Sequence, residues 1–371
     1  MIIRELKLDH FRNLADTSLE FPEKGQLIIG DNGQGKTNLL EAIYYLTLLK
    51  SFRIRNDTEC IRFGESHFLV QGCWTDDHGQ RERVSVGYDS RRKKVALSGI
   101  EKKKVSEAFG IFKSVIFTPD DILIIQGGPA LRRRYLDIVL SIGSPLYLER
   151  LKRYKRALCS RNMLLRKNSV PAAMITPWEE EMAVSGAFVA CRRFSHVRQI
   201  APIYEKLFLG LSSGEKASMA YRSDLLNVSA VSPEDLDETR VGAAFANRLE
   251  KNRRLDQQRG TTLSGPQTDD ILFAVEGRPL RNYGSQGQKR TAVICLKMAE
   301  AEQIRLSNGV QPVLLLDDIF SELDRRRSEN LLQELVERHQ SFITAPRKEV
   351  IFDRLGHLPI RKIERGVISD G

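Results

Sequence analysis

The sequence has few of the residues from which disulfide frameworks, zinc centres and membrane spans are built. Its 371 residues include five cysteines scattered without C-x-x-C spacing and six histidines that form no metal-spaced pair. This pattern argues against a zinc site and indicates reduced thiols in a reducing compartment. No apolar run approaches the roughly 18 residues that cross a bilayer, and no signal-like segment follows Met1. We therefore expect a cytoplasmic protein without a membrane partner.

The charged residues show an excess of one sign. Lysine and arginine number 58 against 48 aspartate and glutamate residues, which gives a formal net charge of +10. Such an excess favours a polyanionic partner such as DNA. The length is compatible with two or three domains of roughly 100 to 200 residues each, which is enough to bury a sizeable core.

A phosphate-binding loop is predicted at 30–37. The segment matches G-x-x-x-x-G-K-[ST] in full, with an apolar run before it at 27–29 and a helix-compatible segment after it at 38–49. In this motif backbone N–H groups bind phosphate oxygens, Lys36 lies near the terminal phosphates and Thr37 offers its hydroxyl to Mg²⁺. The alternative, a glycine-rich turn that ends in Lys-Thr by chance, is disfavoured by the flanking strand and helix. The expected nucleotide-binding residues are Gly30, Asp31, Asn32, Gly33, Gln34, Gly35, Lys36, Thr37 and Asn38.

Two adjacent carboxylates follow a short apolar strand near the other end of the chain. Residues 313–316 read Val-Leu-Leu-Leu, and Asp317 and Asp318 come directly after them. A buried parallel strand presents such side chains at its carboxyl end, where ligands of open α/β sheets bind. We expect Asp317 to reach Mg²⁺, directly or through water, and Asp318 to orient or deprotonate the attacking water. An ordinary strand end with an aspartate helix cap is the alternative for this pair taken alone.

The phosphate loop and the carboxylates must meet around one magnesium ion. The two ends of the chain are therefore expected to fold together, and the long segment between them is expected to be an insertion.

Another helix N-terminus is predicted at 285–288, where Ser-Gln-Gly-Gln precedes a helix-compatible stretch at 289–304. The tetrapeptide resembles S-x-G-Q, the signature motif of ABC-type ATPases. In that family the signature of one subunit caps the γ-phosphate bound by a second subunit, which implies roles for Ser285, Gly287 and Gln288 in a head-to-tail dimer. A serine-capped helix is the commoner explanation of these residues alone. Ser-Glu-Leu-Asp at 321–324 resembles the D-loop that crosses the same interface.

The start of the chain extends the resemblance. An expected strand at 2–8 leads into Phe11-Arg12-Asn13, similar to the F-R-N that opens ATPases of the Rad50, SMC and RecF group. In that group the arginine and asparagine lie beside the nucleotide phosphates, which makes Arg12 and Asn13 further nucleotide-binding candidates. A solvated turn is the alternative. A chain of 371 residues has no room for the long coiled coils of Rad50 and SMC proteins.

The compact member of this group is the RecF family, which the chain resembles essentially from end to end. The matching stretches are 41–46, 50–53, 117–121, 127–133, 283–288 and 316–324. The resemblance implies an α/β fold, with an ABC-type P-loop ATPase core, an antiparallel β layer and an inserted, mainly helical arm domain. It also implies ATP and Mg²⁺ as cofactors and an ATP-dependent homodimer on double-stranded DNA near single-strand gap junctions. The implied partners are RecR and RecO, with which RecF proteins help RecA to load.

Two departures limit what the resemblance implies. RecF proteins usually carry G-P-H-R-D-D where this chain has Gly-Pro-Gln-Thr-Asp-Asp at 265–270, so a role of the His-Arg pair does not apply and Asp269 and Asp270 are assigned only weakly. After the expected last core strand the chain reads Phe-Ile-Thr-Ala-Pro at 342–346. Transporter-type ATPases place a switch histidine there, and its absence disfavours a transporter subunit.

The order of expected elements predicts the domain organisation. Short strands are expected at 69–73, 83–88 and 93–97 in an antiparallel layer with the first strand. Helices are expected at 131–140, 145–167, 178–209 and 241–254, with a strand-like piece at 217–221. We therefore place the first part of the ATPase domain at 1–125, the inserted helical arm at 126–262 and the second part of the ATPase domain at 263–371.

The first half of the arm is strongly basic. Its cations are Arg132, Arg133, Arg134, Arg150, Lys152, Arg153, Lys155, Arg156, Arg161, Arg166 and Lys167, against only Asp137 and Glu149 as acids over the same span. In a RecF-like dimer the arms form a cleft, where such cations could neutralise DNA phosphates with little sequence preference. A solvated helix face is the alternative. Few aromatic residues interleave with the charges, so stacking on single-stranded bases is not indicated.

The leading hypothesis is a weak DNA-dependent, Mg²⁺-dependent ATPase of recombinational repair and replication restart. In it ATP closes two subunits around DNA and hydrolysis releases them. The expected catalytic residues are Lys36, Asp317, Asp318 and Ser285, and the expected metal ligands are Thr37 and Asp317. The alternatives are a transporter ATPase subunit, a nucleotide-gated structural DNA clamp whose hydrolysis is incidental, and a nuclease of the OLD type.

Overall fold

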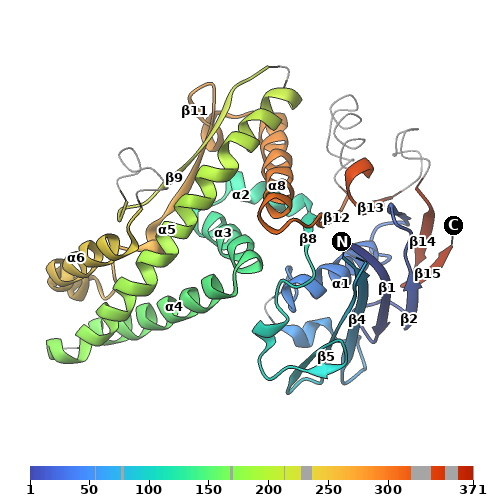
Figure 1. The fold of residues 1–371 in the computed structure, drawn as a ribbon, viewed down its shortest axis with the longest axis horizontal. Helices are drawn as coiled ribbons and strands as arrows, with labels where there is room; N and C mark the ends of the chain where they lie inside the picture. Colours follow the sequence, from blue (N-terminus) through green and yellow to red (C-terminus); the bar gives the residue numbers. More distant parts are fainter. Residues whose placement is uncertain are drawn as a thin grey trace. The chain divides into compact units, whose positions relative to one another are not determined.

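The two ends of the chain fold together into one unit, and the middle of the chain folds into another. The computed structural model describes all residues except 55, 77–78, 168–169, 213, 227–235, 319–335, 347–357 and 371. The first unit combines Met1–Asp121 with Leu296–Gly371, and the second is Ile122–Cys295. Figure 1 shows the blue start and the red end of the chain in the same sheet region. This arrangement agrees with an ATPase core formed from both ends of the sequence.

A mostly parallel sheet forms the centre of the first unit, in the order β15-β14-β3-β13-β12-β8. Its strands are β3 (Gly25–Ile29), β8 (Ser114–Phe117), β12 (Val313–Leu316), β13 (Ser341–Ala345), β14 (Ile360–Glu364) and β15 (Val367–Asp370). All neighbours are parallel except β14 and β15. Every residue of β8, β12 and β13 is buried, as expected of parallel strands covered on both faces. The prediction of a buried parallel strand before Asp317 is confirmed.

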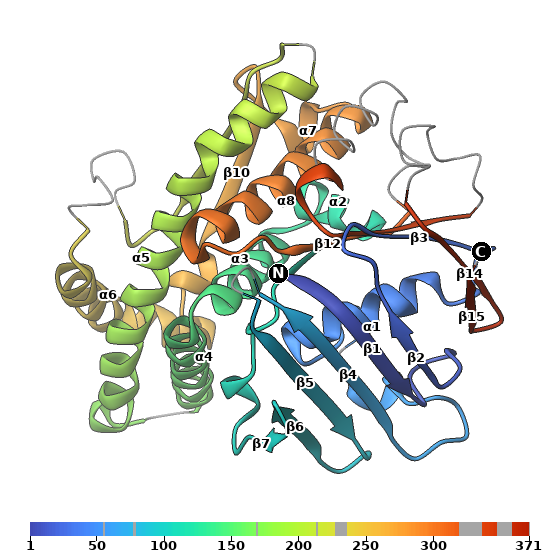
Figure 2. The same ribbon diagram turned by 45° about the vertical axis from the view of Figure 1, so that its right-hand side comes forward.

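An antiparallel sheet forms the second layer of this unit, in the order β2-β1-β4-β5-β6-β7. Its strands are β1 (Ile2–Asp9), β2 (Thr17–Glu20), β4 (Phe68–Thr75), β5 (Arg81–Tyr88), β6 (Lys93–Leu97) and β7 (Ile100–Glu101). Helix α1 (Lys36–Leu48) contacts β4 and β5 of this sheet and β8, β12 and β13 of the parallel sheet. It crosses behind β1 and β4 in Figure 2. Contact with both sheets explains why most of this helix is buried.

A buried glutamine joins the two sheets. The side-chain oxygen of Gln340 accepts a hydrogen bond from the backbone N–H of Ile3 at 2.8 Å. Its amide nitrogen donates to the carbonyl oxygens of Ile3 at 2.9 Å and Pro22 at 2.8 Å. Because these backbone groups find their partners on one side chain, β1 is held directly beside the start of β13.

The second unit is built around long helices and a small sheet. Its helices are α2 (Ile122–Gln126), α3 (Pro129–Gly143), α4 (Pro145–Leu165), α5 (Ala172–Leu211), α6 (Glu238–Arg259), α7 (Leu280–Tyr283) and the start of α8 (Gln286–Asn308). Its sheet has the order β11-β10-β9, with β9 (Ala217–Arg222), β10 (Asp270–Val275) and β11 (Arg278–Pro279). α5 packs against α4, α6 and β9, and it runs along the strands in Figure 1. The predicted small sheet at 217–221 is confirmed.

Two boundaries differ from those expected. α5 begins at Ala172 and passes through Pro177 and Pro202, although a proline inside a helix removes a backbone hydrogen bond and crowds the preceding turn. The second unit runs on to Cys295, since β10 pairs along its whole length with β9. β10 was expected in the second part of the ATPase domain, whereas the structure places it in the same sheet as the arm strand. The domain limits at 125 and 262 stay predictions of functional domains.

Among the residues that the structure describes, no helix has the length and apolar character needed to cross a bilayer.

Candidate functional site

The loop at 30–37 connects β3 to α1, and its shape depends on glycine. Gly35 has a φ of 119°, and a Cβ there would lie 2.9 Å from Leu14 Cδ2, so a larger residue would be strained. Gly30 lies so close to β14 that a Cβ would be 2.3 Å from the carbonyl oxygen of Ile363. α1 begins directly after the loop, and its N-terminus has no side-chain cap. Its first backbone N–H groups can therefore serve an anion.

The side chain of Lys36 lies across this loop. Its ammonium donates hydrogen bonds to the carbonyl oxygens of Gly30 at 2.6 Å and Asp31 at 3.0 Å. Burial lowers the pKa of Lys36, while attraction to Asp318, Asp317 and Asp31 acts in the opposite direction. The loop thus contains a buried positive charge that is electrostatically coupled to the two carboxylates after β12.

Thr37 is the residue through which the loop meets the acidic strand end. Its hydroxyl oxygen lies 3.0 Å from Oδ1 and 2.9 Å from Oδ2 of Asp317, although the two residues are 280 positions apart in the chain. Burial raises the pKa of Asp317, and hydrogen bonds from Thr344 and Thr37 oppose this rise. The structure confirms that the two chain ends bring this hydroxyl and this carboxylate together, and their role as metal ligands stays a prediction.

Asp318 has a backbone conformation that non-glycine residues rarely adopt. Its φ is 47°, in the left-handed region that aspartate tolerates better than most residues. Its backbone N–H donates a hydrogen bond to Thr344 Oγ1 at 2.9 Å. The sequence analysis did not select Thr344, and the only available signal was its place near the end of a core strand.

Arg12 contacts a buried glutamate. Its guanidinium donates to Glu41 Oε2 at 3.0 Å through Nε and to Oε1 at 2.8 Å through Nη2, and Nη1 donates to the carbonyl oxygen of Glu59 at 2.9 Å. Glu41 is fully buried in α1 and also accepts a hydrogen bond from Ser51. Arg12 therefore fixes the turn after β1 against α1, and its predicted contact with nucleotide stays a prediction.

Asn13 lies directly against the phosphate loop. Its side-chain nitrogen is 3.4 Å from the carbonyl oxygens of Gly33 and Gln34, and its side-chain oxygen accepts from Asn38 at 2.7 Å. Asn38 in turn accepts from Arg53 Nη1 at 3.0 Å. These contacts support the loop from the side of the F-R-N turn.

Arg53 is a further candidate to which the sequence analysis gave no role. Its side chain is 45% exposed, and its charge acts on Asp317 to lower the pKa of that carboxyl, against the larger effect of burial. The sequence marks the segment at 50–53 only through the family resemblance. An exposed guanidinium near the loop is suited to binding phosphate.

Ser285 and Gln288 form a reciprocal helix cap in the second unit. Ser285 Oγ accepts a hydrogen bond from the backbone N–H of Gln288 at 3.1 Å, and Gln288 Oε1 accepts from the backbone N–H of Ser285 at 2.8 Å. This is a capping box, so the serine-capped helix considered for this tetrapeptide is present. Ser285, Gln286 and Gly287 are nevertheless exposed, which leaves the predicted role towards a second subunit open. The D-loop prediction at 321–324 lies outside the described residues.

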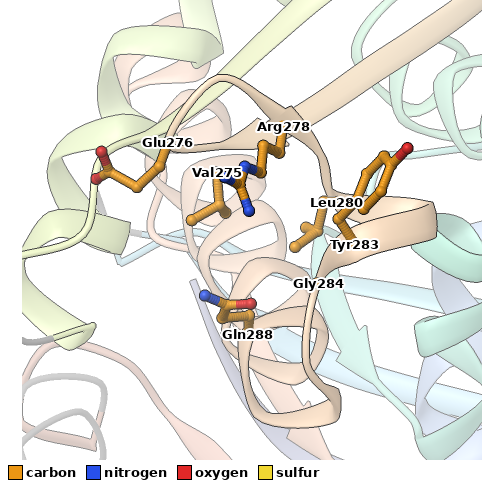
Figure 3. A pocket seen from close by; sticks show the side chains of 7 residues that line it. All are labelled: Val275, Glu276, Arg278, Leu280, Tyr283, Gly284 and Gln288. Atoms are coloured by element: carbon orange, nitrogen blue, oxygen red, sulfur yellow. The ribbon is translucent and has the colours of Figure 1, made fainter.

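A cavity of about 310 Å³ adjoins this turn. Figure 3 shows its lining, in which Val275 and Leu280 supply apolar surface, while Arg278 and Tyr283 come from the elements that precede Ser285. Tyr283 is 70% exposed. Gln288 also lines the cavity, and its side-chain nitrogen donates to Glu215 at 2.7 Å. Gly284 and Gln288, on either side of the turn at 285–287, thus form part of the wall of this cavity.

Several cations of the basic segment pair with acids, and apart from Asp137 these acids lie outside that segment. Arg161 is fully buried and donates to Glu179 at 2.9 Å and Asp256 at 2.7 Å. The other paired cations are Arg132 with Asp270, Arg153 with Glu181 and Lys155 with Asp137. Lys152 and Arg156 are exposed on the opposite side of α4 from its buried residues. Within the described part of the chain, neither has an ion-pair partner.

Asp269 and Asp270 hold the second unit together. Asp270 accepts from Arg132 Nε at 2.6 Å and Nη2 at 3.1 Å. Asp269 accepts from the Tyr221 hydroxyl and lies 3.4 Å from Arg193 Nη1, and burial raises its pKa. These contacts give both carboxylates a structural role, which the sequence alone did not assign.

The fold and the loop define an ABC-type P-loop ATPase core with a flanking antiparallel layer and a mainly helical second unit. The chain belongs to the family described as RecF/RecN/SMC N terminal domain, whose model matches residues 2–368. The expected resemblance to RecF is confirmed. The chain is 36% identical over 349 residues to the DNA replication and repair protein RecF of Bacillus subtilis, covering 93% of each chain. It is also 36% identical over 352 residues to that of Prosthecochloris aestuarii, covering 94% of each.

Solved structures agree with this assignment. The recombination mediator protein RecF-ATP in the RecFOR pathway matches with a TM-score of 0.90 and 34% identity, covering 100% of this chain and 97% of the other. An SMC head bound to the C-winged helix domain of ScpA matches with a TM-score of 0.57 at 17% identity, covering 100% and 96% of the two chains. The second likeness shows a common fold alone.

Proposed function

We propose that this chain binds ATP on the loop at 30–37 and hydrolyses it weakly in a Mg²⁺-dependent reaction. The observation that carries the proposal is the contact between Thr37 and Asp317, with Lys36 buried beside them. A hydroxyl, a carboxylate and a lysine at a helix N-terminus form the constellation of P-loop nucleotide hydrolysis. A RecF relative of the same fold is known as a complex with ATP.

The residues present fit a magnesium ion. Thr37 and Asp317 supply oxygen atoms, which Mg²⁺ prefers, and one or two protein ligands suffice when phosphate oxygens complete the coordination. Burial already disfavours the charged form of Asp317, so a nearby cation would compensate this carboxylate. When bound, the ion would neutralise charge on the phosphate oxygens.

The chain's own residues have distinct proposed roles. The loop N–H groups and Lys36 bind the phosphates, and Asp318 holds the attacking water and accepts its proton. Ser285, Gly287 and Gln288 act on the terminal phosphate held by a second subunit. Arg12 and Asn13 support the loop and contact the nucleotide. Under this proposal a single subunit lacks a complete site, so ATP stabilises a homodimer.

We propose further that the ATP-bound dimer binds double-stranded DNA near single-strand gaps in the cytoplasm and cooperates with RecO and RecR in RecA loading. The support is the relation to proteins named for DNA replication and repair and to a recombination mediator of the RecFOR pathway. The net charge of +10 agrees with such a partner. Hydrolysis would then release the DNA.

Analytical sedimentation tests this function directly. The protein is sedimented alone, with Mg²⁺ and ATP, with gapped duplex DNA, and with both. We expect a monomer without nucleotide, a dimer with Mg²⁺ and ATP, and the tightest DNA binding when both are present. A chain that binds no ATP, or that dimerises equally without it, would contradict the proposal.

The unpaired cations of α4 provide a prediction for DNA binding. Lys152→Gln and Arg156→Gln should each weaken DNA binding and reduce the slope of log affinity against log salt by about 0.9, because each lost phosphate contact releases one counterion fewer. Affinity is measured at several salt concentrations by fluorescence anisotropy. Arg153→Gln is the matched control, since Glu181 already pairs with Arg153 at 2.6 Å. Equal slopes for all three variants and the unaltered protein would show that this side of α4 is a solvated face that does not contact DNA.

A further inference from the structure

Thr344 lies where β13 approaches its end, beside the strand that carries the two carboxylates. It is fully buried, and its hydroxyl oxygen is 2.9 Å from Asp317 Oδ1 and 2.9 Å from the backbone nitrogen of Asp318. One hydroxyl therefore contacts the proposed metal ligand and the backbone of the proposed water-binding residue. Neither the family resemblance nor the loop motif assigned it a role.

The direction of the hydrogen bonds follows from the proton count. A threonine hydroxyl has one proton and two lone pairs. The N–H of Asp318 can only donate, so the hydroxyl accepts there. Its proton must go to an acceptor, and Asp317 Oδ1 at 2.9 Å is much closer than the carbonyl oxygen of Leu316 at 3.5 Å. The proton thus points at the carboxylate.

Both contacts constrain groups that would otherwise be free to change. The left-handed φ of 47° at Asp318 is uncommon and persists where the surroundings hold it. The bond to Asp317 Oδ1 leaves Oδ2 with Thr37 as its hydrogen-bond donor. The carboxylate plane of Asp317 is therefore fixed by two threonines, one from each end of the chain.

We propose that Thr344 is the positioning residue of the acidic pair. It orients the carboxylate of Asp317 towards Mg²⁺, and it fixes the backbone of Asp318, whose side chain holds the attacking water. This inference rests on the proposed ATPase function. Thr344 stands in the segment where transporter-type ATPases have a switch histidine, and here a small buried hydroxyl holds the carboxylates in place. It acts through Asp317 and Asp318 and does not itself touch the nucleotide.

The experiment compares Thr344→Val, which keeps the shape and removes the hydroxyl, with Thr344→Ser, which keeps the hydroxyl. Binding of a fluorescent ATP analogue is titrated with Mg²⁺, and binding is also measured in EDTA. Thr344→Val should raise the half-saturating Mg²⁺ concentration and lower turnover by roughly 10- to 100-fold, as is usual when the residue that orients a metal ligand is lost. Thr344→Ser should stay within a few-fold of the unaltered protein. Binding in EDTA should be unchanged, because the phosphate loop is intact.

Thr47→Val is the matched control, since Thr47 is also buried and shares a hydrogen bond with Ser114 at 2.7 Å in the same unit. If Thr344→Val does not fold, Thr344→Ala replaces it. A variant without the hydroxyl, Thr344→Val or Thr344→Ala, whose Mg²⁺ dependence equals that of Thr47→Val would overturn the inference while leaving the proposed function intact. Failure of the unaltered protein to bind ATP would instead reject the proposed function.

Discussion

Asp318→Asn is expected to retain ATP binding and to lose hydrolysis by roughly 100- to 10,000-fold, the range typical of a general base. Asparagine keeps the size of the side chain but cannot accept the proton of the attacking water. The fold should survive, because asparagine tolerates the left-handed φ of 47° at this position. The hydrogen bond to Thr344 is also kept, since its donor is the backbone N–H of residue 318. Single-turnover hydrolysis and equilibrium ATP binding, measured on the same preparation, separate the two effects.

The control for this variant is Asp89→Asn. Asp89 is an exposed turn residue of the same unit that accepts backbone N–H groups of Arg91 and Arg92, which asparagine can also do. It should leave hydrolysis unchanged. If Asp318→Asn abolishes hydrolysis but leaves the rate of DNA release unaltered, the release model is wrong and the structural clamp is favoured. Unreduced hydrolysis would remove Asp318 from the catalytic assignment.

Lys36→Ala is expected to abolish the ATP-induced dimer and to weaken ATP binding by roughly 10- to 100-fold or more, since hydrogen bonds to charged groups contribute about 1.5 to 3 kcal/mol. The fold should persist because Lys36 donates only to loop carbonyl oxygens, at 2.6 and 3.0 Å. Isothermal titration with ATP and sedimentation with Mg²⁺ and ATP provide the measurements.

Lys113→Ala is the corresponding control. Its ammonium also donates to a backbone carbonyl oxygen, that of Gly110 at 2.9 Å, and burial lowers its pKa in the same direction as that of Lys36. It should cost stability without affecting ATP binding. An ATP-induced dimer of normal strength in Lys36→Ala would show that the loop does not bind the nucleotide as proposed.

The sequence predicted the loop and the acidic strand because both are set by local chemistry. Gly30 and Gly35 are required by the close approach of neighbouring groups, and the apolar run at 313–316 could only be a buried strand or helix segment. Their meeting at Thr37 and Asp317 followed from the need for one metal site. The catalytic roles of these residues stay predictions.

The sequence could not predict the ion pairs between residues that lie far apart in the chain. Glu41 follows the phosphate loop by a few residues, yet its partner Arg12 comes from the turn after β1. Arg161 belongs to a basic run, but Glu179 and Asp256 from two other helices bury it. The sequence shows that a segment is rich in charged residues, but it does not show which of them will form ion pairs in the folded protein.

Two features of the second unit depend on tertiary contacts for a similar reason. The helix expected at 178–209 begins earlier, at Ala172, and α5 packs against α4 and α6. β10 lies beyond the expected limit at 262, yet it pairs with β9, which precedes it by a long connection. Tertiary contacts outweigh local propensity in both cases.

The reciprocal cap of Ser285 and Gln288 also affects how one subunit would recognise a second subunit. Ser285 Oγ accepts from the N–H of Gln288, so its own proton remains for another acceptor. The turn is already ordered, and an ordered turn loses little conformational entropy when it binds. Under the proposed dimer, each subunit would therefore present a rigid donor to its partner. The encounter would be decided by whether the partner offers a suitably placed anionic oxygen, and a subunit without nucleotide would offer none.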